Sequence, residues 1–331
     1  MSTLKTAIIA NKNGMELHVS NFGATIISLK VPNRDGNLTE VVLGLSSPLD
    51  YLKDGYLNEN KCLGSSIGRF AGRISGGGFK IDGQFYPLSQ KNGQHLHGGF
   101  NGFDKRYWKF EDVNKGENPN ITLRYVSQHM EEGYPGNLKV SVTYQLLESN
   151  ELNISYSAKT DKPTHVNLTN HAYFNLNGKG SIVDHLLKIN SNKYLEVNDK
   201  NIPSGNILNS EETPFDRNEI TEVGRSDFKG FDNVFVLSDN EQAAELISNQ
   251  SGIKMIVKTN QPALVVFTPE NLNGFSFKEG VTYNNYTAIC FEAQNFPDAP
   301  NHANFPSSLL LPGEIYETTT SFRFSLLDSR Q

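Results

Sequence analysis

The stretch from His165 to Leu176 reads His-Val-Asn-Leu-Thr-Asn-His-Ala-Tyr-Phe-Asn-Leu, and its apolar and polar residues alternate. Side chains of a β-strand point to opposite faces with a period of two, so this pattern predicts a strand with one buried and one polar face. The predicted buried face carries Val166, Leu168, Ala172, Phe174 and Leu176, with Asn170 the one polar residue among them. The predicted polar face carries His165, Asn167, Thr169, His171, Tyr173 and Asn175.

The polar face of this stretch is unusual in its chemistry. Solvated strands commonly carry Lys, Glu and Thr, whereas this face offers His, Asn and Tyr, which form directional hydrogen bonds with almost no formal charge. Such a face suits a neutral, hydroxyl-rich ligand such as a sugar. The alternative is a strand whose polar side chains make structural hydrogen bonds to loops.

Short alternating runs on both sides of this stretch extend the same pattern along the chain. Further strands are predicted at residues 138–147, 152–160, 287–293 and 317–327, and Asp82-Gly83 marks a hairpin turn. Residues 48–61 hold a short helix or a loop, and residues 204–225 are predicted to be a long loop with little regular structure. Convincing helical periodicity is rare. We therefore predict an all-β fold, a large sandwich of antiparallel sheets, as a single domain over residues 1–331.

The composition excludes several classes of protein. Of the 331 residues, 37% are hydrophobic and 20% charged, which is enough apolar material for a sizeable core. The net charge of −6 argues against a nucleic-acid surface, and no apolar run suggests a secretory signal or a membrane span. The two cysteines, Cys62 and Cys290, are fewer than a secreted disulfide scaffold would carry, so we expect a cytoplasmic protein, with a pairing of these two left open. The sequence does not distinguish a monomer from a homodimer.

Glu292 is a candidate catalytic residue. On the predicted strand at residues 287–293 it shares a face with Ala288 and Cys290, small residues that leave room for a ligand. A carboxylate on an inner sheet face must be hydrogen-bonded or bound to a ligand, because burying it unpaired is costly. The alternative is a glutamate at a strand end that reaches solvent or pairs with an arginine.

His95 and His97 share one face if their segment is extended, and His-x-His is a spacing seen among metal ligands. A third ligand such as His171 or Glu292 would complete a metal site. The alternative is a structural histidine, with its hydrogen bonds satisfied, for at least one of the two. The Gly-x-Ser-x-Gly pattern at residues 64–68 lacks a following helix, so we interpret it as a chance match to the nucleophile elbow.

Together these motifs resemble the aldose 1-epimerase family, and they occur in the family's order over nearly the whole chain. The matching segments are Gly68-Arg69-Phe70-Ala71-Gly72-Arg73-Ile74, Leu96-His97-Gly98-Gly99, residues 167–176, Gly230-Phe231-Asp232, residues 292–299 and residues 311–316. The resemblance implies a large antiparallel β-sandwich with a sugar cleft on one sheet. It also implies interconversion of the α and β anomers of a free aldohexose of the galactose or glucose type.

The resemblance assigns roles to individual residues. Glu292 matches the general base that takes the proton from the C1 hydroxyl, and His171 matches the general acid that protonates the ring oxygen. His97 matches a second histidine near that oxygen. Arg73 and Asp232 match partners of the sugar hydroxyls, and Tyr173 shares the predicted strand face of His171, which places it at the cleft.

The residue types agree with this chemistry. Ordinary pKa values near 4.3 for Glu and 6.5 for His make the carboxylate the natural base, and a nearby carboxylate favours the protonated imidazole. Neither a metal nor an organic cofactor is expected, because the open-chain intermediate is a stable aldehyde. The chain departs from the family pattern at Gly72, where an asparagine is frequent, and at Val265, where a sugar-binding glutamine falls. Both departures bear on substrate preference.

Three alternatives stay open from the sequence alone. A glycosidase would need two carboxylates flanking the scissile bond, which Asp232 and Glu292 would supply. A lectin-like protein would use Glu292 and His171 only to bind a sugar. A phosphorylated hexose would require extra cations near the cleft, and Arg69 is the spare cation that the sequence offers.

Overall fold

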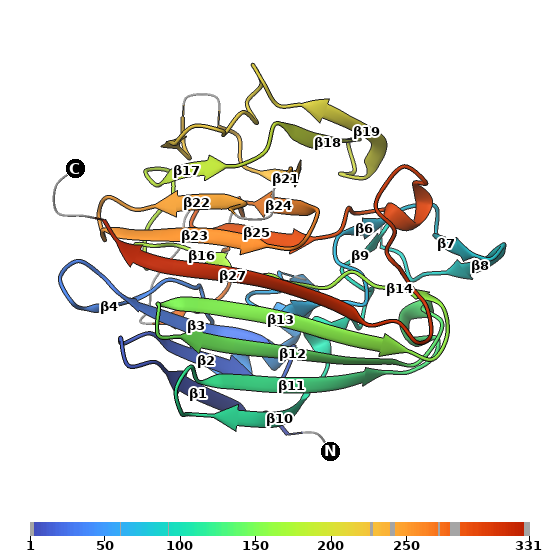
Figure 1. Cartoon of the computed structure of the whole chain (residues 1–331), viewed down its shortest axis with the longest axis horizontal. Helices are drawn as coiled ribbons and strands as arrows, with labels where there is room; N and C mark the ends of the chain where they lie inside the picture. Colours follow the sequence, from blue (N-terminus) through green and yellow to red (C-terminus); the bar gives the residue numbers. More distant parts are fainter. Residues whose placement is uncertain are drawn as a thin grey trace.

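The computed structural model describes residues 3–59, 61–91, 93–225, 228–238, 242–270, 272–278 and 285–327. Three antiparallel sheets make up most of it (Figure 1). The largest has nine strands in the spatial order β10 (Lys109–Asn114), β11 (Asn120–Ser127), β12 (Leu138–Leu147), β13 (Glu151–Thr160), β27 (Tyr316–Leu326), β23 (Ile253–Thr259), β22 (Ala244–Ile247), β17 (Leu186–Ile189) and β20 (Thr221–Glu222).

A six-stranded sheet carries the residues of greatest chemical interest. Its order is β16 (Tyr173–Phe174), β25 (Ile289–Gln294), β24 (Ala263–Phe267), β21 (Asp232–Val236), β18 (Lys193–Val197) and β19 (Pro203–Asn209). The third sheet has four strands, β1 (Thr6–Ala10), β2 (Glu16–Ser20), β3 (Thr25–Pro32) and β4 (Leu38–Glu40). The prediction of an all-β sandwich is confirmed.

Short two-stranded pairs and single helical turns join these sheets. The pairs are β5 (Ser66–Ile67) with β15 (Thr169–Asn170), β6 (Arg73–Ile74) with β9 (His95–Leu96), β7 (Gly78–Ile81) with β8 (Gln84–Pro87), and β14 (Thr164–His165) with β26 (Leu309–Leu310). The short helices include η1 (Pro48–Leu52), α1 (Asp54–Glu59), η2 (Phe103–Lys105), η3 (Glu131–Gly133) and η5 (Ala299–Asn301). No helix among the described residues is both long and apolar enough to cross a membrane.

The main core fills the space between the large sheets. Along β12 and β13 buried residues alternate with partly exposed ones, which is the pattern of strands with one face against a core. Figure 1 shows the red C-terminal strand β27 lying between green β13 and orange β23. Residues from both large sheets share one buried cluster, including Ile154, Phe322, Phe291 and Leu264.

The segment 165–176 is not the single strand that its alternation predicts. It is divided into β14, β15 and β16, which pair with three different partners, and its residues on both predicted faces are all buried. The prediction of one continuous strand is therefore wrong, and the polar face is buried as well as the apolar one. Side-chain amides explain the division, because Asn167, Asn170 and Asn175 each donate to backbone carbonyls of neighbouring segments.

Other local predictions have mixed outcomes. The Asp82-Gly83 hairpin is confirmed as β7 and β8, and residues 48–61 contain the short helices η1 and α1. The long loop predicted at residues 204–225 is wrong in part, because β19 and β20 fall within it. These strands lie at the outer edges of their sheets, where a polar sequence carries little strand signal.

Candidate active site

Strand β25 presents Glu292 to a cleft on the outer face of the six-stranded sheet. All six residues of β25 are buried, and alternate side chains point to opposite faces. Phe291 and Ala293 join the main core, so Glu292 points the other way. Directly opposed residues in antiparallel strands share a face, and Val265 on β24 lies opposite Glu292.

The sheet register also brings His171 to Glu292. Tyr173 on β16 is paired with Cys290 on β25, so the residue two positions before Tyr173 reaches the level of Glu292. On the other side, Val234 on β21 is paired with Val265. The cleft floor is therefore a row of four residues across the sheet, in the order His171, Glu292, Val265 and Val234.

The cleft encloses about 200 Å³, which is smaller than the roughly 300–1,000 Å³ of pockets for drug-sized ligands and suits a ligand of monosaccharide size. The structure brings all six site residues predicted from the sequence into its lining. They are Glu292, His171, His97, Arg73, Asp232 and Tyr173.

Glu292 and His171 form a buried pair in this cleft. Glu292 Oε1 lies 3.5 Å from His171 Nε2, and the two side chains are 3% and 6% exposed. Among the described residues, neither Glu292 Oε2 nor His171 Nδ1 has a hydrogen-bond partner. Glu292 is thus neither a solvent-exposed strand end nor a residue that pairs directly with an arginine, and the pair retains free hydrogen-bonding capacity for a ligand.

Burial shifts the pKa values of both groups toward their neutral forms. Burial and the nearby Asp232 carboxylate raise the pKa of Glu292 to about 8, although the Arg73 guanidinium opposes the shift. Burial lowers the pKa of His171 to about 4. The expectation that a neighbouring carboxylate favours the charged imidazole is therefore outweighed by desolvation.

His97 meets this pair from a loop that follows β9. Its backbone is left-handed, with φ of 51°, and its ring centroid lies 5.5 Å from that of His171. The backbone N–H of Gly72 donates to His97 Nδ1 at 3.2 Å. In the neutral ring the proton therefore sits on Nε2, which becomes a hydrogen-bond donor.

The metal interpretation of His95 and His97 is only partly supported by their positions. His95 is a structural histidine, bonded to the Ser89 carbonyl at 2.8 Å and to the Tyr134 hydroxyl at 2.8 Å. His97, His171 and Glu292 do place one potential ligand atom each within 4.8 Å of one another. Because Gly72 occupies Nδ1 of His97, its other nitrogen carries a proton, and the arrangement favours a proton donor over a metal ligand.

Polar side chains on the far side of the cleft form a second cluster. Arg73 Nη2 lies 3.4 Å from Asp232 Oδ2, and Asn201 Nδ2 donates to the same oxygen at 2.7 Å. Asn201 was not predicted from the sequence, because a lone asparagine in a turn gives no signal of its own. This cluster offers both donors and an acceptor, as recognition of vicinal hydroxyls requires.

The Tyr173 side chain packs against His171 of this pair. Its ring stacks on that of His171, with centroids 5.0 Å apart and an interplanar angle of 9°. Its hydroxyl donates to the Lys61 carbonyl at 2.7 Å, which fixes the ring. Tyr173 therefore lines the cleft and holds the His171 ring in one orientation.

The two departures from the family pattern both lie in the cleft lining. Gly72 has φ of 79°, and a Cβ there would lie 2.9 Å from the Pro297 side chain. Val265 adds an apolar surface beside Glu292, together with Val234, Val197 and Phe267. This apolar floor was not predicted from the sequence, because it depends on which strands lie side by side.

Arg69 is not available to the cleft. It is buried and donates to Ser127 Oγ at 2.8 Å and to the carbonyls of Pro135 and Gln128. The spare cation proposed for a phosphorylated hexose is therefore a structural residue.

Comparisons with known proteins agree with this site. The family model described as aldose 1-epimerase matches residues 5–323. Galactose mutarotase from Homo sapiens is 39% identical over 323 residues, covering 94% of this chain and 92% of the relative. Aldose 1-epimerase from Escherichia coli K12 is 34% identical over 332 residues, covering 96% and 94%. The crystal structure of galactose 1-epimerase from Lactobacillus acidophilus superposes with a TM-score of 0.85 at 30% identity, covering 98% of this chain and 100% of that one.

Proposed function

Because this chain belongs to the aldose 1-epimerase family, we propose that it is an isomerase that interconverts the α and β anomers of a free aldose of the galactose or glucose type. The observation that carries the proposal is the buried pair of Glu292 and His171, 3.5 Å apart in a cleft of monosaccharide size.

The reaction needs two proton transfers and no redox step. The proton of the C1 hydroxyl is removed while the ring oxygen is protonated, so the C1–O5 bond breaks and an aldehyde forms. Rotation about the C1–C2 bond presents the other face of the carbonyl, and the reverse transfers close the ring. We assign Glu292 as the base at the C1 hydroxyl and His171 as the acid at the ring oxygen.

The pair holds one proton over a wide pH range. With a pKa of about 8 for Glu292 and about 4 for His171, the pair carries one proton at neutral pH, and at rest that proton is on Glu292. Catalysis requires that proton to move to His171 and leave a carboxylate on Glu292, and the Arg73 guanidinium favours that carboxylate. A base whose pKa lies near the operating pH is well matched to a reversible proton transfer.

The remaining cleft residues would orient the sugar. The Nε2–H of His97, which the Gly72 bond to Nδ1 leaves available, would donate to the ring oxygen, on which charge develops as the C1–O5 bond breaks. Arg73, Asp232 and Asn201 would bind hydroxyls on the opposite edge of the ring. The stacked Tyr173 would keep the His171 ring aligned with the ring oxygen.

The test is the rate of anomer exchange, followed by polarimetry on a freshly dissolved α-anomer. Glu292→Gln and His171→Asn should each slow turnover by roughly 10²–10⁴-fold while circular dichroism shows an unchanged fold. Near-normal rates in either variant would refute the assignment. Sugar binding without anomer exchange in the unaltered protein would instead support the lectin-like alternative.

The glycosidase alternative is not favoured. Asp232 is already engaged by Arg73 and Asn201, so it is a poor candidate for the acid or nucleophile of glycoside cleavage. We also propose a reducing, cytoplasmic compartment, because two cysteines are fewer than a secreted disulfide scaffold carries.

A further inference from the structure

The loop that carries His97 has an unusual backbone. Three consecutive residues are left-handed, with φ of 51° at His97, 84° at Gly98 and 104° at Gly99. A residue with a side chain rarely adopts this conformation, and histidine keeps it here because its surroundings impose it. The N–H of Gly99 donates to the Leu96 carbonyl at 3.0 Å, which closes the turn. The position of His97 therefore also depends on what binds the residues that follow this turn.

Glu132, which is distant in the sequence, binds the end of this loop. Its Oε2 accepts the N–H of Phe100 at 3.1 Å, and its Oε1 accepts the N–H of Asn101 at 2.9 Å. The hydroxyl of Ser89 also donates to Oε2, at 2.8 Å. The loop passes so close to this carboxylate that a Cβ at Gly99 would collide with Oε2. Both carboxylate oxygens are therefore used to hold the loop.

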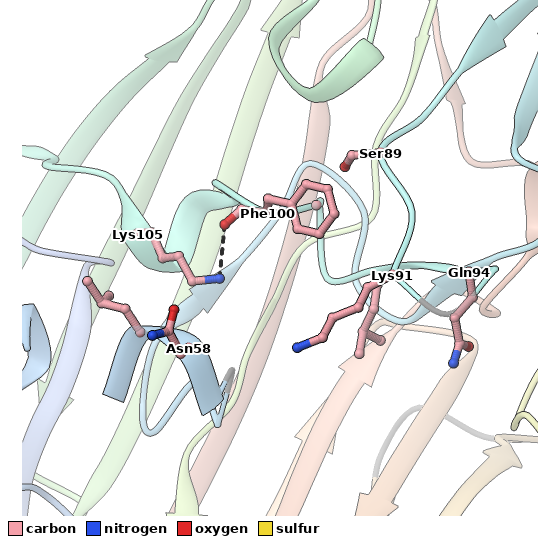
Figure 2. A pocket seen from close by; sticks show the side chains of 9 residues that line it. Asn58, Ser89, Lys91, Gln94, Phe100 and Lys105 are labelled. Atoms are coloured by element: carbon pink, nitrogen blue, oxygen red, sulfur yellow. Dashed lines mark hydrogen bonds between the residues drawn. The ribbon is translucent and has the colours of Figure 1, made fainter. Parts of the chain in front are cut away.

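Two cations bind the carbonyl groups of the same residues. Lys105 Nζ donates to the Phe100 carbonyl at 3.1 Å, the bond drawn in Figure 2. Arg106 Nε donates to the Asn101 carbonyl at 3.0 Å. All four backbone polar groups of Phe100 and Asn101 are thus bonded to charged side chains. Hydrogen bonds with an ionised partner are roughly twice as strong as neutral ones, so this part of the loop is firmly restrained.

The turn that carries Glu132 is itself restrained. Glu132 lies in η3, between β11 and β12, and its φ of 51° is also left-handed. The buried guanidinium of Arg69 donates to the carbonyls of Gln128 at 2.7 Å and Pro135 at 2.9 Å, one on each side of η3 along the chain. Arg69 thereby fixes the two ends of the turn, and the Glu132 carboxylate extends from a defined position.

The same turn also binds the chain before His97. The hydroxyl of Tyr134 bonds to His95 Nε2 at 2.8 Å, and His95 Nδ1 bonds to the Ser89 carbonyl at 2.8 Å. The turn therefore holds the chain at His95, two residues before His97, and at Phe100, three residues after it. His97 lies on the short segment between these two points.

We propose that Glu132 is a positioning residue for His97: its carboxylate holds the loop so that the Nε2–H of His97 is directed at the ring oxygen of the sugar. This inference rests on the proposed function, which gives His97 that donor role. Glu132 does not line the catalytic cleft, so it acts through the loop and not on the sugar. Its carboxylate only accepts hydrogen bonds, whereas an amide would turn an NH2 group toward a backbone N–H. Glu132→Gln thus keeps the size of the side chain and loses part of this binding.

The first test is the kinetics of Glu132→Gln, followed by polarimetry on freshly dissolved α-galactose. We expect kcat to fall about 5- to 20-fold and KM to change less than about 2-fold, because the donor of His97 acts on charge that develops after the sugar has bound. Glu40→Gln is the matched control. Glu40 on β4 also accepts a backbone N–H, from Leu29 at 2.7 Å, and a hydroxyl, from Ser28, but it lies outside the cleft lining and its loss should leave kcat unchanged.

The second test observes the His97 ring directly. Long-range 1H–15N spectra of protein labelled at histidine show which ring nitrogen carries the proton, and the signals of His97 are those that disappear in His97→Asn. The proton should be on Nε2 in the unaltered protein and in Glu40→Gln, because the Gly72 N–H occupies Nδ1. In Glu132→Gln the displaced ring should show a mixture of both tautomers.

Ser89→Ala provides a second variant in case Glu132→Gln does not fold. It removes one of the three bonds to the carboxylate and leaves the turn intact, so kcat should fall in the same direction by about 2- to 3-fold.

The outcomes separate this inference from the proposed function. An unchanged kcat in Glu132→Gln, a change confined to KM, or a His97 proton that stays on Nε2 in this variant would each overturn the positioning role and leave the isomerase intact. Failure of the unaltered protein to exchange anomers would contradict the proposed function itself, whereas the His97 spectra would still report whether Glu132 holds the ring.

Discussion

Glu292 illustrates how a single residue acquires its chemistry from its position. A glutamate in water is ionised at neutral pH, whereas burial beside Asp232 raises the pKa of this one to about 8. The sequence predicted Glu292 and His171 as site residues, because motif and residue type both indicated them, and the structure brings the two together in one cleft. It could not predict the direction of their pKa shifts, since these depend on how completely the folded chain removes water from the pair.

The single proton that the Glu292–His171 pair carries between pH 4 and pH 8 predicts a bell-shaped dependence of kcat/KM on pH. Below pH 4 the pair takes up a second proton, so the base is lost and the rate falls as the pH falls. Above pH 8 the pair loses its proton, so the acid is lost and the rate falls as the pH rises. Polarimetry from pH 3 to pH 10 measures both limbs once the spontaneous rate is subtracted.

An acid limb centred near 6.5 would show that His171 titrates as an ordinary histidine and would contradict the account of a pair that carries a single proton. A rate that stays constant from pH 8 to pH 10 would contradict the role of a retained proton at the ring oxygen.

Val265, in the apolar part of the cleft lining, leads to a prediction about substrate choice. Valine beside Glu292 cannot bind a hydroxyl, so the protein should tolerate the loss of the sugar hydroxyl that faces this position. In Val265→Gln the new amide should favour the hydroxylated sugar about 5- to 10-fold, because a buried amide left unpaired is costly.

The measurement is kcat/KM for galactose and for its 2-, 3-, 4- and 6-deoxy analogues in both proteins. Val265→Leu, which keeps the position apolar, should leave the preferences unchanged. If the ratio of kcat/KM for galactose to that for each analogue is the same in Val265→Gln and in the unaltered protein, Val265 does not face a sugar hydroxyl.

At the scale of elements, the segment from β14 to β16 shows the limit of pattern-based prediction. Its alternation correctly indicated burial of Val166, Leu168 and Phe174, but it did not reveal that the polar positions are also buried. Asn167 and Asn175 make structural hydrogen bonds to loops, which was the alternative to ligand binding, whereas His171 and Tyr173 reach the cleft. Alternation alone cannot separate these roles, because both use the same residue types.

Asn167 should therefore be important for stability. Its amide donates to the carbonyls of Ala71 and Asn295 at 3.1 Å each, and its Oδ1 accepts the N–H of Asn295 at 2.8 Å, just beyond the end of β25. Asn167→Ala leaves these buried groups unpaired and should lower the free energy of unfolding by about 2–4 kcal/mol.

Urea unfolding followed by circular dichroism measures this loss. The control is Asn114→Ala, because among the described residues the exposed Asn114 side chain bonds only locally, to the N–H of Gly116, and its loss should cost less than about 0.5 kcal/mol. Equal stability of Asn167→Ala and Asn114→Ala would show that the three buried bonds do not stabilise the fold.

At the scale of the whole molecule, the sequence predicted the fold class but not the strand order. Strands such as β12 and β13 could be predicted almost to the residue, because each alternates regularly and a short turn joins them. The neighbours of β27 could not be predicted, because β13 and β23 lie far from it along the chain. The same non-local pairing brings β16, β25 and β24 together and so assembles the cleft.

The central claim is that this assembly makes Glu292 and His171 act as one proton-transfer unit. The most direct test is kcat for anomer exchange in Glu292→Gln, His171→Asn and the double variant, measured under one set of conditions. For residues that act as a unit, the double variant should be about as slow as the slower single variant. A double variant whose loss equals the product of the two single losses would show that the two groups act independently.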